Sequence, residues 1–125
     1  MSEREYSLKY SNPHDFIGTK PITVLFGEER VDVRHWSGVY KAIYERVNQD
    51  PQAREDLLYL RNKASGKVRV FISDSPAGMT KPIKVDDEIF VESHYGVETM
   101  CHIMLDCILR YVRYDISNIK IILRD

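Results

Sequence analysis

The chain has 125 residues, of which 43% are hydrophobic and 30% are charged, a composition typical of one folded domain rather than of a disordered or membrane-spanning chain. Its 18 Lys and Arg residues nearly balance 19 Asp and Glu residues, so the formal net charge is -1. This balance excludes the chain-wide positive field that draws proteins to nucleic acid or anionic lipid. Any anion-binding site must therefore be local.

Two features bear on the compartment. The N-terminal residues lack the apolar core of a secretory signal, and no run of about 18 apolar residues occurs; we expect a cytoplasmic protein without a membrane partner. Cys101 and Cys107 lie in an apolar helical pattern, at a spacing that suits neither a metal site nor a disulfide within one helix. We expect both to be small core residues in a reducing compartment.

The first part of the chain divides into two regions. Residues 1–20 mix tyrosines and charges without clear periodicity, so we expect an N-terminal arm with a short strand at Tyr6–Tyr10. Residues 21–125 carry regular apolar patterns, and we expect them to form a single α+β domain.

The domain begins with an expected β-hairpin and a helix. Ile22–Phe26 is rich in β-branched and apolar residues, and Gly27–Glu29 can turn it into Val31–Val33. Apolar side chains then recur at helical spacing at Trp36, Val39, Tyr40, Ile43 and Val47. This stripe predicts an amphipathic helix in which Trp36 is a core anchor.

A second helix and a strand are expected in the middle of the chain. Asp50 and Pro51 supply an N-cap and a first helical residue, and Gly66 is well placed to end the helix. The alternation in Val68–Ser73 predicts a half-buried strand. The turn-forming residues of segment 74–82 predict a loop.

The C-terminal half has a roughly similar order of elements, without an internal repeat. Ile83–Val85 and Ile89–Glu92 predict a second hairpin, helical spacing runs from about Tyr95 to Tyr114, and Ile119–Leu123 predicts a last strand. The order is therefore β-β-α-(α)-β-β-α-β. Because hairpins imply mainly antiparallel pairing, we expect an α+β two-layer sandwich with the helices against one sheet.

The last helix carries a stripe of ionisable side chains at helical spacing, at Glu98, His102, Asp106, Arg110 and Arg113. One interpretation is a solvated face whose Asp106–Arg110 pair contributes roughly 0.3–0.5 kcal/mol. The other is a cationic patch in which Arg110 and Arg113 bind phosphate through their planar guanidinium groups. The sequence leaves both open.

A second cluster of candidate residues lies nearer the middle. Arg69 and Phe71 share the strand face opposite Val68, Val70 and Ile72; either Phe71 is core and Arg69 reaches the sheet edge, or both contribute to a site. His94 and Tyr95, between a strand and a helix, can bond or stack with a ligand. Alternatively, they cap and cover the first helical turn.

No catalytic signature is present. The HExxH, GxSxG, Walker and GxGxxG patterns are all absent, so we expect no metal, no cofactor and no enzymatic activity. An acidic group suggests a nuclease but lacks the lysine-containing spacing that such a site requires; it comprises Asp86, Asp87, Glu88 and Glu92.

Two resemblances follow from these segments. The blocks Val33–Trp36, Val68–Ser73, Ile89–His94 and Ile119–Leu123 resemble a small module of bacterial restriction-associated and mobile-element proteins. This resemblance implies an accessory module that binds nucleic acid or a protein partner. In that alternative, phosphate contacts would come from Arg34, Lys41, Lys63, Lys67 and Arg69.

The size and the strand-helix order are also similar to those of phage anti-Thoeris sponge proteins, which sequester a cyclic nucleotide signal without cleaving it. That resemblance implies that Arg110 and Arg113 hold phosphates, while Phe71, Phe90 or Tyr95 stacks on a base.

Our leading hypothesis is therefore a non-enzymatic sponge protein for a small phosphate-bearing, nucleotide-like ligand in phage or mobile-element anti-defence. The candidate ligand-binding residues are Arg110, Arg113, Arg69, Phe71, Phe90, His94 and Tyr95. We also expect a homo-oligomer, because a small domain with eight tyrosines and a terminal strand has an edge or a patch to cover.

Overall fold

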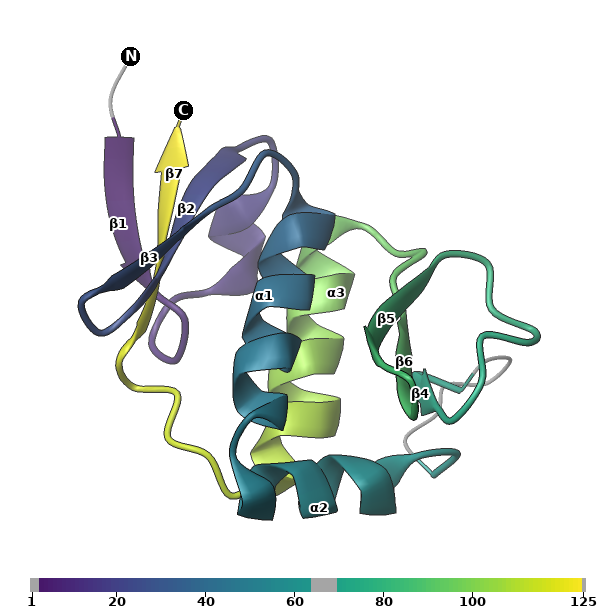
Figure 1. The fold of residues 1–125 in the computed structure, drawn as a ribbon. Helices are drawn as coiled ribbons and strands as arrows, with labels where there is room; N and C mark the ends of the chain where they lie inside the picture. The colour runs from purple at the N-terminus through teal and green to yellow at the C-terminus, as the bar shows by residue number, and fades with distance from the viewer. Residues whose placement is uncertain (1–2, 64–69, 125) are drawn as a thin grey trace.

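The computed structural model describes residues 3–63 and 70–124. Its strands form two antiparallel sheets (Figure 1). The four-stranded sheet has the order β1-β7-β2-β3, with β1 at Glu3–Ser7, β7 at Ile119–Arg124, β2 at Lys20–Phe26 and β3 at Glu29–Asp32. The three-stranded sheet has the order β4-β6-β5, with β4 at Ile72–Ser73, β6 at Ile89–Glu92 and β5 at Pro82–Asp86.

The helices lie between these sheets. Helix α1 (Trp36–Asn48) contacts β2 of one sheet and β5 of the other, and α3 (Val97–His102) runs beside it, while α2 (Pro51–Leu60) crosses one end of the pair (Figure 1). The expected α+β sandwich of mainly antiparallel strands is confirmed. The strands are divided between two sheets, so α1 buries residues against both of them.

The N-terminal segment belongs to this core. Strand β1 pairs along β7, with Tyr6 opposite Ile121, and Leu8 and Phe16 are fully buried. The ring of Phe16 packs on that of Trp36 at a centroid distance of 5.3 Å. Residues 3–20, which we expected to form an arm, thus contribute an edge strand and part of the core, and the strand lies earlier than Tyr6–Tyr10.

The local signals of the first half are confirmed. Strands β2 and β3 form the expected hairpin, and Gly27 turns it with a φ of 64°, a conformation that glycine adopts at little cost. The Asp50 carboxylate accepts a bond from the Ala53 N–H at 2.9 Å, as an N-cap does. Helix α2 ends at Leu60, and Gly66 lies outside the described residues.

The second half follows the expected hairpin but differs in its last helix. Strands β5 and β6 pair antiparallel, and β4 is only two residues long. After α3 the chain continues as a π-helical segment, Ile103–Ile108, and a 3-10 turn, Leu109–Tyr111. Because a π-helix takes more residues per turn, the residues after Ile108 do not fall on the helix faces that a 3.6-residue period predicts for them. Leu109 is consequently buried, while Tyr111 is 61% exposed.

Candidate functional site

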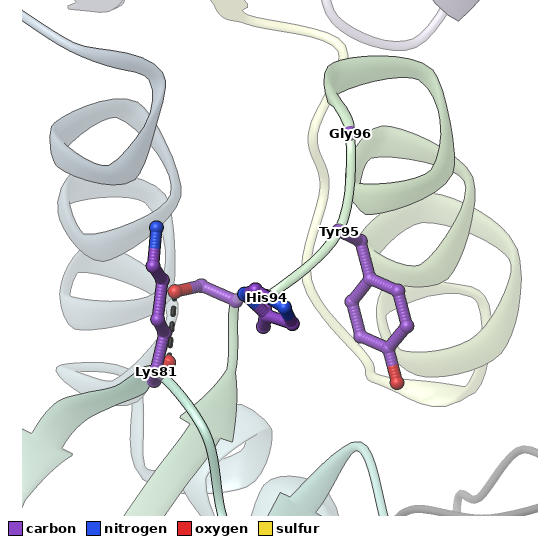
Figure 2. Close-up of a pocket in the computed structure, with 5 residues that line it drawn as sticks. Lys81, His94, Tyr95 and Gly96 are labelled. Atoms are coloured by element: carbon purple, nitrogen blue, oxygen red, sulfur yellow. Dashed lines mark hydrogen bonds between the residues drawn. The ribbon is translucent and has the colours of Figure 1, made fainter.

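A surface pocket lies where β6 leads into α3. It has a volume of about 320 Å³ and is lined by Lys81, Ser93, His94, Tyr95 and Gly96. Figure 2 shows Lys81 on one side of this pocket and Tyr95 on the other, with His94 between them. The pocket thus joins the start of β5 to the segment between β6 and α3, and it contains two of the predicted ligand-binding residues.

The two walls of the pocket are held together by hydrogen bonds to one backbone carbonyl. The Lys81 carbonyl accepts the Ser93 N–H at 2.9 Å and the Ser93 hydroxyl at 2.8 Å, the latter bond being dashed in Figure 2. These bonds extend the β5–β6 pairing, in which Pro82 is opposite Glu92. They fix the backbone of Lys81 while its side chain stays exposed.

The buried carboxylate of Glu92 reinforces the same junction. Glu92 is only 1% exposed. Its Oε1 accepts the Thr80 N–H at 2.7 Å, and its Oε2 accepts those of Lys81 at 2.7 Å and Ser93 at 3.1 Å. Burial disfavours the charged form, but the backbone N–H groups outweigh it and the pKa of Glu92 is lowered. The ionised Glu92 carboxylate therefore links the loop before β5 to the end of β6 through hydrogen bonds.

The pocket has cationic and hydrogen-bonding groups available for an anion. Lys81 and His94 are both exposed, and Lys81 takes part in none of the ion pairs found within residues 3–63 and 70–124. A lysine ammonium is a strong donor to phosphate oxygens, and the Ser93 hydroxyl and the imidazole of His94 are further polar groups at the pocket.

The aromatic candidates have three different environments. Tyr95 is half-buried and lines the pocket. Its ring meets Phe71 edge-on, with centroids 6.2 Å apart and an interplanar angle of 77°, so Phe71 supports Tyr95. Phe90 sits within β6 opposite Ser73 and Lys84 and is not among the residues that line this pocket.

The two arginines lie at the other end of the helical run that begins with α3, Arg110 in the 3-10 turn Leu109–Tyr111 and Arg113 just after it. Arg113 donates to Asp56 from its Nε at 3.0 Å and from a terminal nitrogen at 3.2 Å, and its backbone N–H donates to the same carboxylate at 2.8 Å. These bonds lower the pKa of Asp56. Arg113 thus joins α2 to the chain after α3, while Arg110 is exposed.

The predicted grouping of these arginines with an aromatic ring is therefore corrected. Tyr95 and Arg110 are separated by the length of α3 and its continuation, roughly 20 Å at about 1.5 Å per helical residue. The predicted Asp106–Arg110 pair is also replaced, because Asp106 bonds to Nδ1 of His102 at 2.7 Å.

The acidic group considered for a nuclease and the basic residue Lys63 are engaged within the fold. The Asp86 carboxylate accepts bonds from Asn48 at 2.7 Å and from Arg54; burial opposes its ionisation, but these bonds and that of the Glu88 N–H lower its pKa. Lys63 donates to the Tyr59 carbonyl at 2.8 Å. Lys67 and Arg69 lie outside the described residues.

Among residues 3–63 and 70–124, no three His, Cys, Asp or Glu side chains converge as a metal site would require. In the same part of the chain, both cysteines are free thiols, and no helix has the length and apolar character to cross a membrane.

Comparisons with known proteins identify no relative. No protein-family model matches the chain, and neither a curated protein nor a solved structure matches it.

The sequence pointed to His94 and Tyr95 but gave Lys81 and Glu92 no role in this pocket. The signal for both was the hairpin register: with Ile89–Glu92 paired to the strand at Pro82–Asp86, Lys81 comes opposite Ser93. A hairpin drawn residue by residue would have placed Lys81 beside His94.

Proposed function

We propose that this chain is a non-enzymatic binding protein for a small phosphate-bearing ligand of nucleotide type, held in the pocket of Lys81, His94 and Tyr95. The observation that carries the proposal is the placement of a lysine, a histidine and a serine hydroxyl around one hollow of about 320 Å³. Lys81 binds the phosphate, because an ammonium group with no ion pair among the described residues gains a charge-assisted bond there.

The dimensions of the pocket favour a compact ligand. Small-molecule sites usually measure about 300–1,000 Å³, and this pocket is at the lower end of that range. A net charge of -1 supports the same choice, since a long nucleic acid is usually bound through an extended basic surface. A mononucleotide needs only one local cationic group or two.

Calorimetric titration with nucleoside monophosphates and cyclic nucleotides tests this function. Lys81→Ala is expected to weaken binding about 10- to 100-fold, because a hydrogen bond to a charged group contributes about 1.5–3 kcal/mol. Lys41→Ala is the matched control: Lys41 is an exposed lysine on α1 outside the pocket, and its removal should leave affinity unchanged. Equal affinities for wild type and Lys81→Ala, or no binding by the wild type, would contradict the proposal.

The biological setting stays a prediction. A sponge role in phage or mobile-element anti-defence requires that a cyclic nucleotide be recovered intact from the complex, which mass spectrometry of the released ligand can show. A cleaved product would contradict that role. The homo-oligomer also stays a prediction, checked by a sedimentation mass above that of the monomer.

A further inference from the structure

A second hollow adjoins the Lys81 pocket along α3. It has a volume of about 240 Å³ and is lined by Ile17, Gly18, Gly96, Val97, Glu98 and Thr99. Gly96 lines both hollows, and Figure 2 shows it where the chain turns into α3, directly after His94 and Tyr95. A ligand seated by Lys81 can therefore extend over Gly96 into this second hollow.

The second hollow is apolar in character. Ile17 is 54% exposed, one of the few large hydrophobic residues in the described chain with so much of its surface in water. The Glu98 carboxylate in its wall is engaged, since its Oε2 lies 2.9 Å from Nδ1 of His14. An exposed isoleucine beside the half-buried Val97 offers a surface on which an apolar or planar group gains by burial.

Gly96 leaves the junction between the hollows open. Its φ is -66° and its ψ is 166°, which any residue can adopt. A Cβ built on it would meet no atom within 4 Å. Neither backbone conformation nor packing in the described structure therefore requires a glycine, whereas a side chain there would add bulk at the residue that both hollows share.

We infer that the ligand has two parts: a phosphate group bound by Lys81 and His94, and a nucleobase that crosses Gly96 and packs on Ile17. This inference rests on the proposed function and names its ligand class as a nucleoside phosphate rather than a sugar phosphate or a free phosphate. The two groups lie at opposite ends of a nucleoside monophosphate, and the two hollows that would hold them share Gly96 in their lining.

Calorimetric titrations with adenosine 5′-monophosphate, ribose 5-phosphate and inorganic phosphate separate the two parts. The wild type is expected to bind the nucleotide at least about tenfold more tightly than ribose 5-phosphate, because the base buries apolar surface on Ile17. Ile17→Ser should remove most of this preference without changing the affinity for ribose 5-phosphate. Gly96→Ala should weaken nucleotide binding more than ribose 5-phosphate binding, with an unchanged melting temperature.

Tyr10→Ser is the matched control for loss of an exposed apolar side chain, since Tyr10 is 75% exposed and lines neither hollow. If nucleotide and ribose 5-phosphate bind equally, and Ile17→Ser and Gly96→Ala bind as wild type does, the two-part ligand is wrong while the proposed function stands. If neither these three ligands nor the cyclic nucleotides bind, the proposed function fails and the two-part ligand fails with it.

Discussion

Replacing Glu92 by glutamine tests the hydrogen bonds by which its carboxylate joins the loop of residues 74–81 to β6. Glutamine has nearly the same shape but only one carbonyl oxygen, and its amide nitrogen must face a backbone N–H. The wild-type carboxylate accepts bonds from Thr80, Lys81 and Ser93. A bond to a charged acceptor contributes about 1.5–3 kcal/mol, and an unsatisfied buried donor costs a similar amount. We therefore expect Glu92→Gln to lower the free energy of unfolding by about 2–3 kcal/mol at pH 7.

Urea denaturation across pH measures this loss and its origin. The pKa of Glu92 is lowered from its ordinary value of 4.5, so its ionised form stabilises the folded state fully above that value. As the pH falls below 4.5 and through the lowered pKa, this contribution disappears, and the gap between wild type and Glu92→Gln should shrink.

The control for that experiment is Glu45→Gln, which neutralises an exposed carboxylate on α1. Surface changes of this kind usually alter stability by less than about 0.5 kcal/mol. Two results would refute this role of the Glu92 carboxylate. One is a Glu92→Gln variant as stable as Glu45→Gln at pH 7; the other is a stability difference between wild type and Glu92→Gln that does not change between pH 7 and pH 3.

Three further predictions concern the core and the helix start. Tyr44→Phe should leave the free energy of unfolding unchanged or raise it by up to about 1 kcal/mol, because the buried Tyr44 hydroxyl has no partner in the described structure; a loss above that size in urea denaturation would contradict this. Asp50→Ala should cost about 1 kcal/mol through loss of the α2 cap, and an unchanged urea midpoint would contradict it. Burial raises the pKa of Cys101 to about 11 and also raises that of Cys107, so both thiols should react slowly with a thiol reagent at pH 8 in the native protein and rapidly in urea; fast native labelling would contradict this.

The parts of the fold that depend on neighbouring residues were predictable from the sequence. The β2–β3 hairpin requires only two β-rich segments and Gly27 between them, and the start of α2 requires only Asp50 and Pro51. Pairing between β1 and β7 was not predictable in this way, because it joins the two ends of the chain. Strand β1, with the sequence EREYS, carries no apolar alternation that would indicate such a partner.

The last helix shows why the candidate site was predicted only in part. A 3.6-residue period placed Arg110 and Arg113 on the face of Glu98, but the π-helical segment Ile103–Ile108 rotates the later residues away. Arg113 is bound by Asp56, which is distant in sequence. His94, which we predicted to bind a ligand, lines the pocket, and its position between strand and helix is local information that the sequence carries.

The most direct test of the central claim is a titration of ¹⁵N-labelled protein with adenosine 5′-monophosphate, followed by amide chemical shifts. We expect the shifts to cluster at Lys81 and at residues 93–97, around the pocket where β6 meets α3. They should be absent in Lys81→Ala and retained in Lys41→Ala. Shifts centred on Arg110 and Arg113 at the opposite end of the helix, or no shifts at all, would contradict it.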